Sequence, residues 1–219
     1  KDRFKFKPLG KDGLQTKIWP PMQTRDGRFV RTGPETMPGG EDTFVAYGPG
    51  WANASNTPFR GYKHDPYEGG IGTPFIVSWP QGIPSKSNGK VVHDVSHLID
   101  LMPTFVEAAG ATYPEKYDGN DIHPMEGISL IPTLTGGALK RKAPLGFEHH
   151  GNLGLRAGKW KIVSMYRGNQ ARKWELYDME ADRTELNDLA AKMPEKLKSM
   201  VEAWHSWADR VGVQPWRSP

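Results

Sequence analysis

Four short β-rich runs follow one another in the C-terminal third of the chain, and this succession constrains the fold most. They cover residues 145–149, 153–156, 160–166 and 174–177, and glycine-containing turns separate them. Short strands joined in this way usually pair as neighbours in an antiparallel sheet. A tryptophan-rich apolar stripe at helical spacing then begins at about residue 194. We therefore expect a small α+β module in which one C-terminal helix packs on an antiparallel sheet.

A different pattern precedes this module. Residues 75–79 form an apolar, β-rich run that is typical of a buried strand. Asp94 or Ser96 is placed to cap a helix whose apolar positions recur every three or four residues up to Gly110. Pro103 lies inside that pattern and predicts a kink. A strand followed by an amphipathic helix favours an α/β layer.

The first fifty residues lack such periodicity. Glycine and proline, 25 and 19 residues of the 219, recur throughout this segment and interrupt any regular element. A loop of this length within a compact domain is either functional or disordered. We interpret residues 1–50 as an extended insertion on the substrate side of the fold.

Composition excludes several classes of protein. The chain has no cysteine, which excludes disulfide scaffolds, thiol nucleophiles, zinc ribbons and iron–sulfur ligation. Its net charge is +4, and acidic and basic residues are interspersed beyond about residue 90, so we expect no nucleic-acid partner. No run of residues is apolar enough for a membrane span.

Polar and charged side chains are densest between residues 51 and 74, just before the predicted strand. Asn53, Asn56, Lys63, His64 and Glu68 all lie in this stretch. Open α/β sheets place their sites on loops at strand ends, which favours a functional site here. A solvated loop with charged ends is the alternative from composition alone.

Two further groups of polar residues are candidates. His149, His150 and Asn152 lie at a strand end, where they contact substrate or form a surface turn. His93 and His97 have the spacing of a zinc-binding helix, but no third ligand is evident, and capping and packing at the helix start are favoured.

The loop before the predicted strand resembles a known family. Residues 56–63 and 67–80, which contain Lys63 and the Glu-Gly-Gly turn that starts at Glu68, are similar to the corresponding segment of arylsulfatase-type sulfatases. Further similarities follow in the family's order and extend the resemblance over roughly residues 44–210. They lie at residues 94–104, 127–130, 158–161, 175–178 and 184–188.

The resemblance implies an α/β fold: the end of an alkaline-phosphatase-like sulfatase domain, followed by a small α+β domain with an antiparallel sheet and a C-terminal helix. Residues 1–142 then belong to the catalytic domain, and residues 143–219 form the small one. The family hydrolyses sulfate esters with a formylglycine, made from Cys or Ser, beside a Ca²⁺ ion. Lys63 matches the family's lysine that contacts the sulfate, and Asn53, Asn56, His149, His150 and Asn152 are candidate substrate contacts.

The chain departs from the family where the nucleophile is expected. It contains neither a C-x-P-x-R nor an S-x-P-x-R motif, and the aspartates and Asp-Asn-Gly segment that hold Ca²⁺ are absent. We therefore expect the C-terminal part of a sulfatase, inactive without the preceding part of the same protein. The substrate is expected to be an aryl or carbohydrate sulfate ester, and the family suggests a periplasmic or secreted enzyme. A phosphoesterase of the same superfamily and a non-catalytic module that binds sulfated glycans are the alternatives.

Overall fold

The computed structural model describes residues 23–31, 33, 35–37, 39–44, 48–168 and 170–216. The chain divides into two compact units, residues 1–55 and residues 56–219. In the described part of the first unit, two isolated β-bridges precede helix α1 (Gly48–Ser55). Most of the predicted insertion at residues 1–50 lies outside the described residues, and its role stays a prediction, as does a domain boundary at residue 142. Among the described helices, none combines the length and apolarity that a membrane crossing requires.

The second unit contains a four-stranded antiparallel sheet with the order β3-β4-β5-β6. Its strands are β3 (Leu145–His149), β4 (Asn152–Ala157), β5 (Trp160–Ser164) and β6 (Glu175–Asp178). His149 pairs with Asn152, so only two residues connect β3 to β4. Both, His150 and Gly151, have positive φ angles of 51° and 76°, as the two-residue hairpin turn that matches strand twist requires. The predicted antiparallel sheet is confirmed.

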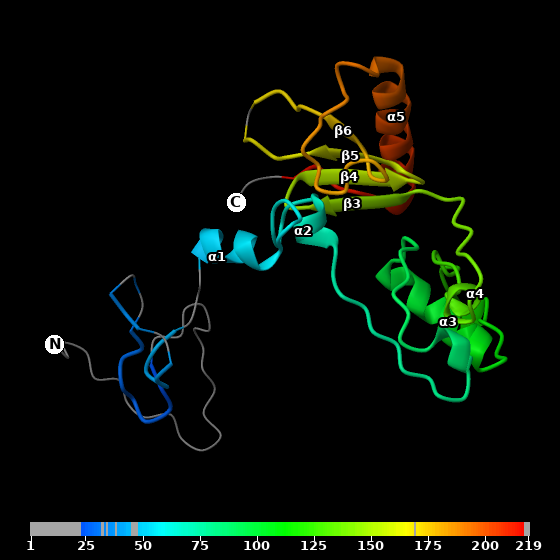
Figure 1. Cartoon of the computed structure of the whole chain (residues 1–219), viewed down its shortest axis with the longest axis horizontal. Coiled ribbons are helices and arrows are strands. Elements are labelled where there is room, and N and C mark those ends of the chain that lie inside the picture. The colour runs from blue at the N-terminus through cyan, green and yellow to red at the C-terminus, as the bar shows by residue number, and fades with distance from the viewer. Residues whose placement is uncertain are drawn as a thin grey trace. The chain divides into compact units, whose positions relative to one another are not determined.

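Helix α5 (Pro194–Val211) lies across one face of this sheet (Figure 1). Proline in its first turn and Gly212 in the left-handed conformation after its end are typical helix boundaries. Its buried stripe packs against alternate sheet residues, because successive side chains of a strand point to opposite faces. This core contains Leu153, Leu155, Ile162, Leu176, Met200, Trp204 and Ala208. The predicted terminal helix and its packing are confirmed, as is the mixed α/β class.

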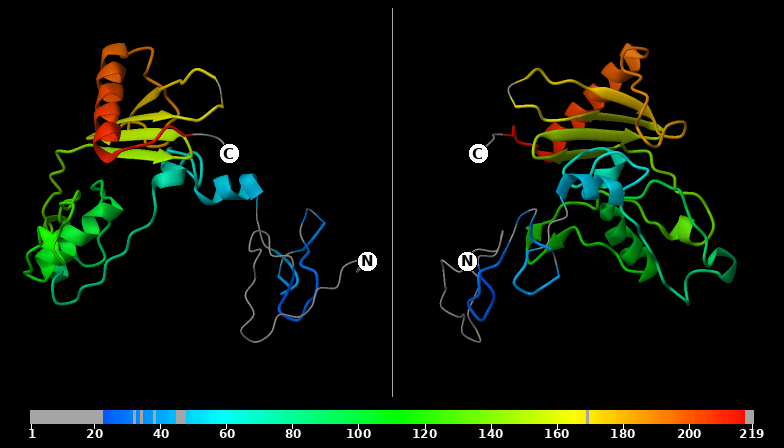
Figure 2. Two further views of the ribbon diagram at one scale, coloured as in Figure 1. Left: turned by 180° about the vertical axis from the view of Figure 1, so that it is seen from behind. Right: turned by 60° about the vertical axis from the view of Figure 1, so that its left-hand side comes forward.

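The opposite face of the sheet is covered by the segment that contains α2 (Glu68–Ile71), which the two views of Figure 2 show beside the strands. Val163 and Tyr177 on this face pack with Tyr67 and Met179 in a second buried cluster. Lys161 alternates with Ile162 along β5 and so belongs to the same face as Val163. The sheet is therefore buried on both sides, by α5 on one and by residues 66–71 on the other.

The remainder of the second unit is built from short elements. These are η1 (Ser85–Ser87), η2 (Leu98–Asp100), α3 (Leu101–Ala108), β1 (Lys116–Tyr117), β2 (Asn120–Asp121) and α4 (Ile131–Leu134). The buried Asp100 connects η2 with the segments around Ile128 and Arg141, because its carboxylate accepts hydrogen bonds from the backbone N–H groups of His97 and Ile128 and pairs with Arg141.

The predicted start of the helix near residue 94 is wrong. The cap is His97, whose Nδ1 accepts a hydrogen bond from the Ile99 N–H while Asp100 accepts from the His97 N–H. This reciprocal arrangement is a capping box, and it starts a 3₁₀ turn from which α3 continues. Pro103 consequently lies in the first turn of α3, where its missing N–H is not needed, so no kink follows from it.

The predicted buried strand at residues 75–79 is also wrong. The segment has no strand assignment, and 52% of Phe75 and 90% of Ile76 are exposed. A β-rich run becomes a strand only when another strand pairs with it, and no strand in the described part of the chain does so. The apolar composition of residues 75–79 is therefore displayed at the surface of this unit.

Candidate functional site

Lys63 lies in a tight loop formed by residues 61–65. The Asp65 N–H donates to the Tyr62 carbonyl oxygen at 3.0 Å, and the Asp65 carboxylate accepts from the Tyr62 N–H at 3.2 Å. Lys63 itself has a φ of 47°, in the left-handed region that non-glycine residues rarely adopt, and its side chain is exposed. Such conformations cluster at functional sites, where surrounding contacts hold them in place.

The Glu-Gly-Gly turn packs directly against the backbone of this loop. A Cβ atom on Gly69 would lie 2.3 Å from the Gly61 carbonyl oxygen, and one on Gly70 would lie 2.1 Å from the Asp65 carbonyl oxygen. The Gly69 N–H also donates to the Arg60 carbonyl oxygen at 2.8 Å. Both positions therefore require glycine, because the turn approaches the Lys63 loop more closely than any side chain allows.

A buried ion network attaches this turn to the sheet. The Nζ atom of Lys161 lies 2.9 Å from a carboxylate oxygen of Glu68 and 2.8 Å from one of Glu185. The side chains of Lys161 and Glu185 are 0% exposed, and that of Glu68 is 12% exposed. The other oxygen of Glu185 accepts the Glu68 N–H at 2.6 Å. Burial raises the pKa of the Glu185 carboxyl, and the Lys161 ammonium opposes that shift.

A second polar cluster holds the residues on either side of the turn. The hydroxyls of Tyr67 and Tyr177 both donate to the Glu175 carboxylate at 2.7 Å, and the Arg60 guanidinium stacks 4.0 Å above the centre of the Tyr67 ring. Burial, reinforced by these hydrogen bonds to Glu175, raises the pKa of Tyr67 and of Tyr177 far above the usual value, so both stay protonated donors.

Two of the predicted site asparagines also contact the Lys63 loop. Asn56 donates from its amide to the Gly61 carbonyl oxygen at 3.2 Å. Asn152, buried at the start of β4, donates to the His64 carbonyl oxygen at 3.1 Å and accepts from the Tyr166 N–H at 2.8 Å. These contacts favour a positioning role for both residues.

The predicted histidines meet beside the same loop. His149 Nε2 lies 2.6 Å from His64 Nδ1, and the His150 ring stacks on both, with centroid separations of 4.7 Å from His64 and 4.2 Å from His149. His64 comes from the Lys63 loop, whereas His149 and His150 belong to the β3–β4 hairpin. Desolvation lowers the pKa of His64, and the neighbouring imidazoles and Lys63 lower it further.

Asn53 and His93 are both exposed. Asn53 lies exposed on α1 in the first unit, so its predicted role stays a prediction. His93 is exposed and His97 caps a helix, which confirms capping as the role of His97.

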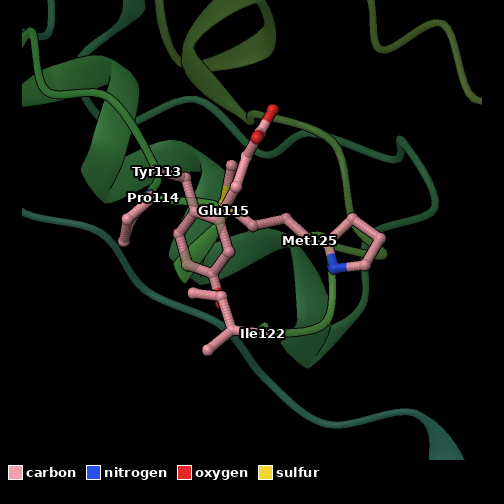
Figure 3. Close-up of a pocket in the computed structure, with 6 residues that line it drawn as sticks. Tyr113, Pro114, Glu115, Ile122 and Met125 are labelled. Carbon is pink, nitrogen blue, oxygen red and sulfur yellow. The ribbon is translucent and has the colours of Figure 1, made fainter. Parts of the chain in front are cut away.

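A pocket beside the β1–β2 hairpin is shown in Figure 3. It is lined by Tyr113, Pro114, Glu115, Ile122, Pro124 and Met125. None of the predicted site residues lines this pocket, and Glu115 is its single carboxylate. We therefore place the candidate site at Lys63 instead.

Comparison with known proteins bears on the same loop. Residues 33–111, which include Lys63 and the Glu-Gly-Gly turn, match the family described as Sulfatase. Over these residues the chain is similar to sulfatases. It is 30% identical over 178 residues to an uncharacterized sulfatase of Schizosaccharomyces pombe, a match that covers 80% of this chain and 32% of the yeast protein. An arylsulfatase of Klebsiella aerogenes is 36% identical over 108 residues, which are 49% of this chain and 23% of the bacterial protein.

A solved structure shares the fold. Ps i-CgsB, whose structure was determined in complex with k-i-k-neocarrahexaose, aligns with a TM-score of 0.55 and 25% identity over 69% of this chain and 32% of its own. The chain thus spans about a third or less of the length of these relatives.

Calcium, which is typical of the family, does not fit the residues described here. Ca²⁺ takes six to eight oxygen ligands, largely from carboxylates. Within the described residues, the group of histidines and carboxylates that is close enough to share one ion consists of His64, His149 and His150, and all its donors are nitrogen. The sequence also contains neither the C-x-P-x-R nor the S-x-P-x-R motif in which a formylglycine is made.

The sequence did not indicate Lys161, Glu185 or Glu175 as parts of the site. All three lie in segments that resemble the family, at residues 158–161, 175–178 and 184–188, but only Lys161 carried a signal of its own, as a charged residue inside an otherwise apolar strand pattern. Their contribution depends on contacts with residues about a hundred positions away, as the 93-residue separation between Glu68 and Lys161 shows.

Proposed function

We propose that the protein containing this chain hydrolyses sulfate esters and that Lys63 binds the sulfate group of the substrate. The observation that carries the proposal is the conformation of Lys63: an exposed cation in a left-handed backbone conformation, within a loop held by the Glu-Gly-Gly turn, Asn56 and Asn152. Similarity to the sulfatase family supports the reaction class.

The chemistry suits a lysine. An ammonium group is a compact charge with three donors, and it neutralises a sulfate oxygen or the ester oxygen as negative charge develops there. The gain depends on a fixed position, because a displacement of about 1 Å at a reacting centre lowers a rate by about 100-fold. The contacts of residues 56, 69 and 152 supply this fixed position for Lys63.

The histidine pair of the hairpin is proposed to contact substrate beyond the sulfate. His149 and His150 are exposed and adjoin His64, the neighbour of Lys63. The relatives include an N-acetylglucosamine-6-O-sulfatase of Bacteroides thetaiotaomicron, 29% identical over 128 residues, so a sulfated carbohydrate is one candidate substrate and an aryl sulfate is the other. Asn53 remains proposed as a further contact.

The finer proposals concern the whole protein. We propose that formylglycine and Ca²⁺ belong to the protein outside residues 1–219, that the 219-residue chain alone is inactive, and that the enzyme is periplasmic or secreted. The lengths of the relatives support the first two proposals. Exposed apolar side chains such as Phe75, Ile76 and Phe105 also support them, since they offer a surface for further parts of the protein.

The test is the hydrolysis of 4-nitrophenyl sulfate by the longer protein that contains this chain. We expect Lys63→Ala to lower kcat/KM by about 100- to 1000-fold, the usual loss when one preorganised charge-stabilising group is removed. Lys90→Ala, at another exposed lysine, is the matched control and should keep wild-type activity. The 219-residue chain should show no turnover.

Three outcomes decide against the proposal. Wild-type kcat/KM in Lys63→Ala would remove the assignment of Lys63. Faster hydrolysis of 4-nitrophenyl phosphate than of the sulfate would favour the phosphoesterase alternative. Salt-sensitive binding of sulfated oligosaccharide that does not depend on Lys63, without turnover by the longer protein, would favour a glycan-binding module.

A further inference from the structure

Three imidazoles converge next to the Lys63 loop from segments that are 85 residues apart. One ligand atom from each of His64, His149 and His150 lies within 4.8 Å of the other two. His64 is half-buried, and both hairpin histidines are exposed. The His64 and His149 rings are nearly parallel, with an interplanar angle of 6°. The group contains no carboxylate.

The backbone brings these histidines together on both sides. Asn152 bonds the His64 carbonyl oxygen and so ties the Lys63 loop to the first residue of β4. His150 occupies the tight hairpin turn, and the Glu148 carboxylate accepts the Gly151 N–H at 2.9 Å. The Trp216 ring stacks on His150 with a centroid separation of 4.7 Å. The convergence is thus held by the fold around the rings, and does not depend on the rings alone.

We propose that His64, His149 and His150 form a binding site for a divalent transition-metal ion such as Zn²⁺. Imidazole nitrogen is a preferred ligand of zinc, copper and nickel, whereas Ca²⁺ and Mg²⁺ prefer oxygen. Three protein ligands leave one position of a tetrahedral zinc open to water or to an anion. Such a site is distinct from the oxygen-ligated calcium that the family suggests.

The required rearrangement is small. Zinc–nitrogen bonds of about 2.0–2.1 Å at tetrahedral angles place ligand nitrogens about 3.4 Å apart. The pair His64 Nδ1 and His149 Nε2, at 2.6 Å, must separate by less than about 1 Å. The widest pair, within 4.8 Å, must approach by less than about 1.5 Å. Rotation of the rings from their stacked orientation supplies both changes, since the side chains of His149 and His150 are exposed.

The experiment measures binding of the metal alone to the full 219-residue chain, in the absence of substrate. Zn²⁺ is titrated by calorimetry in a buffer that does not chelate metals, and Co²⁺ is used to read the coordination from its visible absorption. We expect one ion per chain and tetrahedral Co²⁺ bands. Excess Ca²⁺ should not displace either ion.

Histidine variants test whether the metal binds at the predicted cluster. His64→Ala and His149→Ala should each weaken Zn²⁺ binding by at least about tenfold, since even outer-shell changes cost about 10- to 100-fold. His93→Ala, at an exposed histidine outside the cluster, is the matched control and should bind as the wild type does. Far-UV circular dichroism establishes that each variant is folded.

A measurement on the wild type keeps the test independent of variant folding. Long-range ¹H–¹⁵N spectra report the ring nitrogens of all seven histidines. We expect Zn²⁺ to shift the signals of three histidines that lie close to one another. No binding at millimolar Zn²⁺, equal shifts at all seven, or equal losses in the variants and in His93→Ala would overturn the proposal. Because no substrate is present, this failure leaves the proposed sulfate ester hydrolysis untouched.

Discussion

Replacement of Lys161 by methionine should destabilise the fold in a manner that depends on pH. Lys161→Met keeps an unbranched side chain, one atom shorter, but leaves the fully buried Glu185 without its cation. Glu68 is partly exposed and lies 3.9 Å from Arg183, so the penalty falls mainly on Glu185. Breaking a buried ion pair from one side typically costs about 3–5 kcal/mol.

The loss of unfolding free energy in Lys161→Met has an upper limit that depends on pH. The uncompensated Glu185 avoids its buried charge by binding a proton, and for a carboxyl with an ordinary pKa of about 4.3 this costs about 3.7 kcal/mol at pH 7 and about 1 kcal/mol at pH 5. We therefore expect Lys161→Met to lower the free energy of unfolding by about 3–4 kcal/mol at pH 7 and by clearly less at pH 5.

Urea unfolding followed by tryptophan fluorescence measures this difference, because Trp174 and Trp204 lie at the core between the sheet and α5. Lys159→Met is the matched control. Lys159 pairs with Asp178 at the surface, where such pairs contribute about 0–1 kcal/mol. Adding Glu185→Gln to Lys161→Met should recover part of the loss at pH 7. A loss below about 1 kcal/mol at pH 7, or an equal loss at pH 5, would refute the reasoning.

Two further substitutions test the contacts that support the Lys63 loop and the contacts that support residues 182–187, the segment that contains Glu185. Gly70→Ala places a Cβ atom 2.1 Å from the Asp65 carbonyl oxygen, so it should lower the free energy of unfolding by about 1–3 kcal/mol, measured by thermal unfolding. Gly50→Ala, whose Cβ atom would have nothing within 4 Å, is the control and should be neutral or stabilising. Equal effects of the two substitutions would contradict the close packing at Gly70. The pKa of Asp182 is lowered because hydrogen bonds to its carboxylate, including those from the Leu186 and Asn187 N–H groups, outweigh its desolvation. The stability that Asp182 contributes is therefore complete above its unfolded pKa of about 3.9 and is lost as pH falls through the lower folded pKa. Asp182→Ala should consequently flatten the acid side of the curve of unfolding free energy against pH. An unchanged acid side in this variant would disprove the role of Asp182.

The sheet and α5 were predictable from sequence because local patterns decide them. The runs at residues 145–149 and 160–164 are bounded by tight turns, and the stripe of α5 spans five helical turns. The mixed α/β class follows from these elements. Neither the sheet nor α5 depends on contacts between residues that are far apart in the sequence for its prediction.

The features that the sequence did not predict correctly share a different physical cause. The strand predicted at residues 75–79 has the right composition, but its existence depends on a pairing partner that composition does not reveal. Lys161 stands in a strand pattern at a position that alternation assigns to solvent, and it is buried because residues 66–71 cover that face. The convergence of His64 with His149 was likewise invisible, because the hairpin is 85 residues away.

The separation between the Glu-Gly-Gly turn and its anchors has a kinetic consequence. The hairpins of the sheet close over a few residues, whereas the Glu68–Lys161 contact closes a loop of 93 residues and pays a larger entropy before it forms. We therefore expect the conformation of Lys63 to be set late in folding, after the sheet has formed. We expect changes at Glu68 or Gly70 to act mainly on the rate of unfolding.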